Sequence, residues 1–267
     1  MKVSVNQTRL VGPPIAQEQF ISEHLFFYLE KGIMSGYYGN KTYTLKSGHY
    51  GVVRKNRLSK QSDLKFNGAI EKVIFVFDET FLKVFQEKYR LQPVRFQSDE
   101  SFIRLGNRSL IPAFINSLKP YYNEHGQIDH EFFDVKREEL LLILLHVQPD
   151  LAGVFFDYGI PEKIDLEAFM NLNYRFNVSV ERFAFLTGRS LSAFKRDFHT
   201  IFHQTPSRWL VQKRLYEAYF LIDKKKQKPS EIFLDLGFET LSHFSFAFKR
   251  QFGRTPTALA EGGEVVG

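Results

Sequence analysis

Two short segments, 190–206 and 240–256, contain side chains suited to contacting another molecule. The first segment contains Ser192, Lys195, Arg196 and His199. The second contains Ser242, His243, Ser245, Phe246, Lys249 and Arg250. Hydroxyl, imidazole and guanidinium groups hydrogen-bond to the edges of bases, and cationic groups pair with phosphates. The chemistry that these residue types predict is recognition of a nucleic acid.

Residues that catalyse reactions do not occur in a recognisable arrangement. The chain has no Cys, which excludes disulfides, Cys-based zinc sites and Cys nucleophiles. We find no Gly-rich phosphate loop, nucleophile elbow or catalytic triad. His199 and His203 are four residues apart, but no neighbouring ligand set completes a metal site. His24 and His49 lack the His-x-His spacing of a metal-binding cupin. We therefore expect no enzyme activity, no metal and no cofactor.

The two segments repeat one another at an offset of 50 residues. Ser190–Pro206 aligns with Thr240–Pro256 without gaps, and seven of the 17 positions are identical: a Leu, a Ser, three Phe, a Thr and a Pro. An internal repeat of this kind indicates that one structural unit occurs twice.

The identical positions predict a helix in each copy. Phe194, Phe198 and Phe202 are four residues apart and would form one buried face, which leaves the polar residues on the other. Ser190 and Thr240 stand where a hydroxyl caps the start of a helix. A short helix and a Gly turn are expected before each, and this order is the helix-turn-helix plan.

The excess of positive over negative charge lies in the part of the chain that contains the repeat. Residues Arg175 to Pro256 include 15 Lys or Arg and 7 Asp or Glu, a net charge of +8. The rest of the chain has 21 basic and 23 acidic residues, a net charge of −2. A segment with this excess of positive charge favours a polyanion as partner.

The C-terminal third resembles the AraC/XylS family of transcription regulators over about residues 165–260. The resemblance is closest at 235–256, where a Gly-Phe turn, spaced Phe residues, Lys-Arg-x-Phe-Gly and a closing Thr-Pro match the family pattern. The family implies two recognition helices, joined by a long helix, that enter successive major grooves on one face of double-stranded DNA. Carried over by position, the groove residues of the first unit are Ser192, Lys195, Arg196 and His199. Those of the second are Ser242, His243, Ser245 and Phe246, and we expect Lys249 and Arg250 to anchor phosphates.

Phe246 departs from the family pattern, which often has Arg or another polar residue at this position. It aligns with Arg196 in the first unit. An apolar side chain in the major groove would contact the methyl group of thymine. The alternative is that Phe246 packs against the connecting helix and does not meet DNA.

The N-terminal half has a different pattern. Short apolar runs separated by Gly, Asn, Lys and Ser predict strands in residues 1–97, and Asp78 is expected to cap a short helix that ends near Tyr89. Helical spacing follows from about residue 107, including a helix from about 131 to 147 that is apolar around much of its second half. Such a helix is buried in its own core or in a subunit interface. In the second case, a charge at Leu141 or Leu145 would break a dimer.

Together these patterns predict an α+β protein. Its N-terminal domain is a β-rich, cupin-like sensor domain with appended helices, and its C-terminal domain is all-α, with two helix-turn-helix units joined by a long helix. The predicted limits are 1–157 for the sensor and dimerisation domain (β-rich 1–97, helical 98–157), 158–164 for a linker, and 165–260 for the DNA-binding domain, with units at 180–202 and 230–252.

The predicted function is that of a sequence-specific transcription regulator that binds double-stranded DNA as a homodimer. We expect a small-molecule or protein effector at the N-terminal domain, and RNA polymerase is a candidate partner. The longest apolar run, Leu140–Leu145, is too short to cross a membrane, and the absence of Cys suits the cytoplasm. The alternative from another class is a cupin-like small-molecule-binding protein or enzyme with an accessory helical domain.

Overall fold

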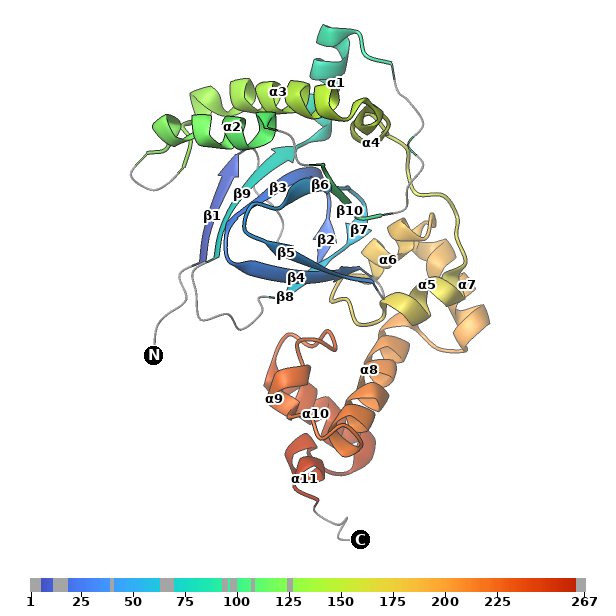
Figure 1. Cartoon of the computed structure of the whole chain (residues 1–267). Coiled ribbons are helices and arrows are strands. Elements are labelled where there is room, and N and C mark those ends of the chain that lie inside the picture. Colours follow the sequence, from blue (N-terminus) through green and yellow to red (C-terminus); the bar gives the residue numbers. More distant parts are fainter. Residues whose placement is uncertain are drawn as a thin grey trace. The chain divides into compact units, whose positions relative to one another are not determined.

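The computed structural model describes residues 6–11, 19–38, 41–62, 70–92, 96, 100–106, 109–123 and 127–262. Two compact units divide the chain, Met1–Gly159 and Ile160–Gly267, which we call the N-terminal and C-terminal units. The N-terminal unit contains the described strands together with several helices, and the C-terminal unit is built from helices (Figure 1). The α+β class predicted from the sequence is therefore confirmed.

The strands of the N-terminal unit form three sheets. The five-stranded sheet has the order β1 (Asn6–Val11), β9 (Ile70–Phe77), β3 (His24–Lys31), β6 (Tyr50–Val53) and β10 (Phe102–Arg104). A three-stranded sheet consists of β5 (Lys41–Lys46), β4 (Ile33–Tyr38) and β8 (Lys60–Ser62), and a two-stranded sheet of β2 (Phe20–Ile21) and β7 (Arg57–Leu58). β1 pairs with β9 in parallel, and the other pairings between described strands are antiparallel.

The five-stranded sheet is buried on both faces, which explains the continuous apolar runs Leu25–Leu29 of β3 and Val73–Phe77 of β9. Phe26 of β3 and Phe75 of β9 point into a core shared with the helices. Their neighbours Phe27 and Ile74 point the other way, into a core shared with β4 and β5. Successive side chains of a strand alternate between faces, so a strand covered on both sides has no polar face.

Helices cover the first of these faces (Figure 1). They are α1 (Glu79–Tyr89), α2 (Leu110–Ser117), α3 (His130–Val147) and α4 (Ala152–Phe155), with 3-10 turns η1 (Lys119–Tyr121) and η2 (Pro149–Leu151). The cap predicted for α1 is confirmed, because the Asp78 carboxylate accepts a hydrogen bond of 3.0 Å from the backbone N–H of Phe81.

The hypothesis that Leu141 lies in a subunit interface is wrong. Leu140, Leu141 and Leu144 are fully buried in the core of the N-terminal unit, and Leu145 packs against that core. The apolar residues that α3 leaves exposed are Phe132, Val135 and Leu142. The sequence showed that α3 has apolar residues on several sides, but the side that faces the sheet depends on how the helix lies on it.

β10 is a strand inside the region predicted to be helical, 98–157. It pairs with β6 through Phe102, Ile103 and Arg104 and thereby adds a strand to the edge of the five-stranded sheet. Three residues are too few to show a period of two in the sequence. The predicted helical region, 98–157, therefore begins too early in the chain.

His24 is a buried base in the N-terminal unit. Its Nδ1 accepts a hydrogen bond of 3.3 Å from the backbone N–H of Lys55, and its ring meets the edge of Phe155. Burial, together with the positive charges of Lys55 and its neighbours, lowers the pKa of His24 well below its ordinary value. His49, the other histidine considered for a cupin metal site, accepts a hydrogen bond from the backbone N–H of Lys46 instead.

The C-terminal unit consists of seven helices in its described part. They are α5 (Leu166–Asn173), α6 (Val180–Leu186), α7 (Leu191–Phe202), α8 (Pro206–Asp223), α9 (Pro229–Ile232), α10 (Leu241–Phe252) and α11 (Pro256–Ala260). α9 is the short helix expected before the second Phe row, and the chain continues from residue 233 to 237 as turns. No helix in the described part of either unit is long and apolar enough to span a membrane.

Candidate nucleic-acid interface

Both copies of the repeat place their Phe row against α8. Phe194 and Phe198 of α7 are fully buried, as are Phe244 and Phe248 of α10. Phe202 lies 4.6 Å from the ring of Trp209 near the start of α8, and Phe252 lies 5.0 Å from the ring of Tyr219 in its second half. α8 therefore carries one helix-turn-helix at each end.

The first turns of α7 and α10 are capped as the sequence predicted. The Ser190 hydroxyl accepts a hydrogen bond of 3.3 Å from the backbone N–H of Ala193, and the Thr240 hydroxyl accepts one of 3.1 Å from His243. Each cap satisfies one of the free N–H groups at the start of its helix. The caps and the buried Phe rows together fix which face of α7 and α10 is turned to solvent.

Glycine is required in both turns that precede these helices. Gly188 has φ of +65° and Gly237 has φ of +81°, in the left-handed region that favours glycine. A Cβ atom on Gly188 would lie 2.4 Å from the backbone of Glu162, and one on Gly237 would lie 2.6 Å from the carbonyl oxygen of Arg175. The turns are therefore constrained by close contacts as well as by conformation.

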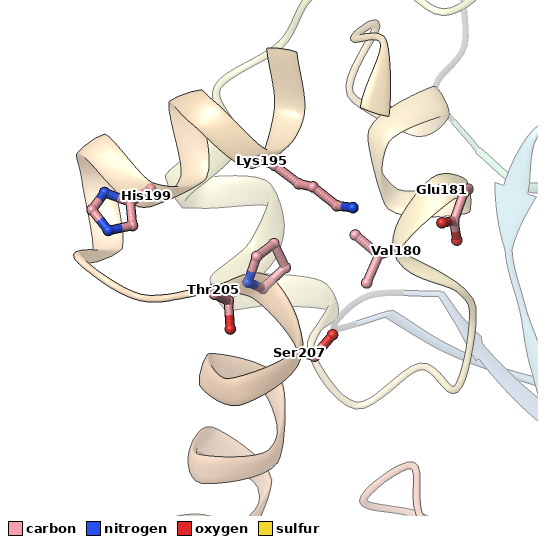
Figure 2. Close-up of a pocket in the computed structure, with 7 residues that line it drawn as sticks. Val180, Glu181, Lys195, His199, Thr205 and Ser207 are labelled. Atoms are coloured by element: carbon pink, nitrogen blue, oxygen red, sulfur yellow. The ribbon is translucent and has the colours of Figure 1, made fainter. Parts of the chain in front are cut away.

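The exposed face of α7 holds all four groove residues predicted for the first unit: Ser192, Lys195, Arg196 and His199. Lys195 and His199 border a groove of about 430 Å³ together with the starts of α6 and α8. Figure 2 shows Lys195 extending from α7 toward Val180 and Glu181 of α6, with Thr205 and Ser207 at the beginning of α8.

Arg196 is tied to its neighbour Asp197. Its guanidinium donates hydrogen bonds of 3.3 and 3.0 Å to Oδ1, although 75% of its side chain is exposed. The other carboxylate oxygen lies 3.2 Å from Nε of Arg189 and 3.8 Å from Nζ of Lys163. The hydrogen bonds from Arg196 and Arg189 lower the pKa of Asp197, so this carboxylate is charged at neutral pH. Asp197 is a residue that the sequence reasoning missed, because its partners Arg189 and Lys163 lie eight and more positions away.

The exposed face of α10 is less polar than that of α7. Ser242, His243, Phe246, Lys249 and Arg250 are exposed, and Ser245 is half-buried. Phe246 is 69% exposed, so it is not part of the core of the unit. It borders a groove of about 680 Å³ whose opposite wall is α8. The described residues that line this groove include cationic Arg208 and Arg250 and no carboxylate.

Three residues of α8 join the predicted set at this surface. Ser207 borders both grooves, and Arg208 and Gln212 border the groove beside Phe246. The sequence assigned α8 only a connecting role. The start of a helix at Thr205-Pro206 could have indicated Ser207 and Arg208, since the first turn of a helix offers free N–H groups to an anion.

Two family descriptions match the chain. An ExsA N-terminal regulatory domain matches residues 24–154, and a helix-turn-helix domain matches residues 183–262. The regulatory protein SoxS of Escherichia coli is 31% identical over 93 residues, which are 35% of this chain and 87% of SoxS. The chain belongs to the AraC family of transcription regulators.

Similarity to an AraC-family regulator also extends over most of the chain. The virulence regulon transcriptional activator VirF of Yersinia enterocolitica is 25% identical over 252 residues, 88% of each chain. A solved structure of ToxT from Vibrio cholerae superposes with a TM-score of 0.37 at 14% identity, over 91% of this chain and 91% of that one. As an AraC-family member, the chain is a sequence-specific DNA-binding transcription regulator with a regulatory N-terminal domain.

Proposed function

We propose that α7 and α10 are the two recognition helices and that they read successive major-groove segments on one face of double-stranded DNA. The observation that carries this proposal is the shared design of the two helices. Each buries a Phe row against α8 and turns the residues between the Phe positions to solvent. An α-helix fits the major groove, where each base pair presents its own pattern of donors and acceptors.

The first unit provides the sharper reading of bases. Arg196 can leave Asp197 and present its planar guanidinium to the N7 and O6 atoms of guanine. Lys195, Ser192 and His199 lie on the same exposed face and supply further hydrogen bonds. The second unit presents Phe246 to a thymine methyl group, with Ser242, His243 and Ser245 beside it and Lys249 and Arg250 on phosphates.

The proposal is tested with the full chain. DNA fragments selected by the wild type from a random pool define the site, and Arg196→Ala should weaken binding to it by about 1–3 kcal/mol and relax the preference at one position. Arg104→Ala removes the same charge from the N-terminal unit and is the matched control. An unchanged sequence preference in Arg196→Ala would remove Arg196 from the reading surface.

The second unit is tested by Phe246→Ala. We expect weaker binding to sites that contain thymine in the second segment, with thermal stability nearly unchanged, because the side chain is largely exposed. Lys249→Ala and Arg250→Ala should each reduce the dependence of affinity on salt by about one released ion without changing the sequence preference. A large loss of stability in Phe246→Ala with an unchanged preference contradicts this role.

The chain is proposed to act as a homodimer through the exposed apolar row of α3, which consists of Phe132, Val135 and Leu142. These side chains are 39%, 60% and 40% exposed and are spaced so that they share one side of the helix. Val135→Asp should dissociate the dimer in sedimentation experiments at micromolar concentration. Val84→Asp on α1, where Val84 is 61% exposed, places the same charge elsewhere. A wild type that sediments as a monomer and binds DNA fully contradicts the proposal.

Regulation is proposed to enter through residues 1–157, with an effector that changes DNA binding by residues 165–260 in the cytoplasm. The name of VirF is that of an activator, and we extend this direction to the present chain, with RNA polymerase as partner and no catalytic step. With purified RNA polymerase, a template that carries the selected site upstream of a promoter should be transcribed more when the protein is added. Reduced transcription would reverse the assigned direction.

A further inference from the structure

α8 connects the two helix-turn-helix units, but it is not their only connection. Trp209 anchors the first unit on α8 and Tyr219 anchors the second. Ten residues of α-helix separate these anchors by about 15 Å. Arg214 lies midway between them and is buried, with 7% of its surface exposed.

Arg214 joins the segment that follows α5 to the turn of the second unit through backbone carbonyl groups. Its Nε donates to the carbonyl oxygen of Tyr174 at 2.7 Å and its NH2 to that of Phe176 at 2.8 Å, just after α5. α5 packs on the first unit, where the rings of Phe169 and Phe183 lie 6.4 Å apart. The NH1 of Arg214 donates to the carbonyl oxygen of Gly237 at 2.9 Å, in the turn of the second unit. The rigid fork of a guanidinium can satisfy three acceptors at fixed angles.

A second contact lies one helical turn farther along α8. The Glu217 carboxylate accepts a hydrogen bond from the Tyr174 hydroxyl and one of 2.9 Å from Nε of Arg175, and 14% of its side chain is exposed. Asn177 donates to Glu239 at 3.2 Å and so joins the segment that follows α5 to the second unit. The close approach of Gly237 to the carbonyl oxygen of Arg175 belongs to the same contact.

We propose that Arg214 and Glu217 are positioning residues that hold the two units at one relative angle, so that the chain selects DNA sites by the spacing between their two segments. The inference rests on the proposed function of α7 and α10. An extra base pair between the segments rotates one by about 34–36° relative to the other and moves it by about 3.4 Å. Two units joined by α8 alone could follow this change by bending, but units held by Arg214 and Glu217 must break these contacts.

The experiment compares two DNA fragments with the full-length chain. One fragment carries the site that the wild type selects from a random pool, and the other carries the same site with one base pair inserted between its two segments. For the wild type we expect the insertion to weaken binding by about 100-fold or more, as several mismatches do. For Glu217→Ala the penalty should fall to about 10-fold or less, while affinity for the unaltered site changes little. Glu231→Ala removes an exposed carboxylate of the second unit and should keep the wild-type penalty.

Further variants separate positioning from a general loss of structure. Arg175→Met should lower the penalty and Arg175→Lys should restore it, because Lys keeps a charge opposite Glu217. Arg214→Lys keeps the charge but cannot reach three carbonyl groups, so it should lower the penalty as well. The inference fails if the folded Glu217→Ala and Arg175→Met variants lose as much affinity on insertion as the wild type, or if the wild type loses none. The proposed function would still stand in either case. A wild type that selects no sequence overturns the inference and the proposed function together.

Discussion

The first and second helix-turn-helix units have the same internal construction and different outer faces. α7 and α10 are each 12 residues long, start at a capping hydroxyl and bury two Phe side chains completely. Outside, α7 presents Arg196 tethered to Asp197, whereas α10 presents Phe246 at the aligned position. The comparison teaches that the residues which form the core of the repeat are constrained together, while the exposed positions are free to differ and set what each unit reads.

The charge around the two faces differs for the same reason. Position 197 is Asp in the first unit, and the aligned position 247 is Ala in the second. Asp197 therefore binds Arg189 and Arg196, whereas no ion pair holds Lys249 or Arg250 in the part of the chain that the structure describes. These two cations of α10 can therefore meet DNA without first leaving a carboxylate.

The largest expected change in the free energy of unfolding distinguishes the buried side of α10 from its exposed side. Phe248→Ala empties a fully buried position and should lower the free energy of unfolding by about 3–5 kcal/mol. Phe246→Ala, two residues away and 69% exposed, should change it by about 0.5 kcal/mol or less. Urea denaturation of the full chain, followed by the helical signal, measures both. Equal losses would mean that both side chains belong to the core.

Gly237 and Gly253 both have a positive φ, but they differ in how closely other atoms approach them. Gly237→Ala combines a strained φ with a backbone oxygen at 2.6 Å and should lower the free energy of unfolding by about 2–5 kcal/mol. Gly253, which ends α10 with φ of +74°, has no atom within 4 Å of such a Cβ, so Gly253→Ala should lower it by about 1–2 kcal/mol. The same denaturation experiment compares them, and a smaller loss at Gly237 would argue against its close contact with Arg175.

A smaller effect, on DNA affinity, is expected when the charge at position 197 is removed or is introduced at the aligned position 247. Asp197→Asn releases Arg196 and removes a negative charge beside the reading face, so DNA affinity at low salt should rise by about 0.5–1 kcal/mol. Ala247→Asp introduces the same charge into the second unit and should lower affinity by a similar amount. Binding titrations at two salt concentrations test both, since the effects should shrink as salt rises. Unchanged affinity in both variants would contradict an electrostatic role for this position.

The smallest effect concerns the ends of the two helices. His203 ends α7 in the left-handed conformation with φ of +54°, where the second unit has Gly253. His203→Gly should raise the free energy of unfolding by about 0.5–1 kcal/mol, because glycine adopts this conformation without strain. Thermal unfolding measures the gain. A loss of stability would show that the His203 side chain makes contacts that outweigh the strain.

The sequence predicted those features of the site that depend on local spacing. The Phe rows, the caps at Ser190 and Thr240 and the exposed reading faces all follow from periods of a few residues. The hydrogen bonds of Arg214 could not be predicted, because its acceptors Tyr174 and Gly237 lie 40 and 23 positions away. In the sequence, nothing distinguishes Arg214, which has carbonyl rather than carboxylate partners, from the other cationic residues of a basic helix.

The same limit applies to the N-terminal unit. The sequence predicts the central strands β3, β6 and β9 from their apolar runs, but it does not show that both faces of the sheet are covered. The sequence therefore left both the core and a subunit interface open for Leu141, which belongs to the core, whereas its neighbour Leu142 is exposed. One position along a helix changes the direction of a side chain by about 100°, so a small rotation of the helix decides between the two.

The parallel pairing of β1 with β9 joins distant parts of the chain and thereby affects the folding rate of the N-terminal unit. Asn6 pairs with Ile70, and one core contains both Val11 and Phe156, so native contacts must form between distant parts of the chain. In the C-terminal unit, the core that α8 forms with α9, α10 and α11 has all its buried residues between Leu215 and Leu259. Chains with distant contacts fold more slowly than chains with local ones. The regulatory unit, although synthesised first, is therefore expected to reach its native state more slowly than the DNA-binding unit.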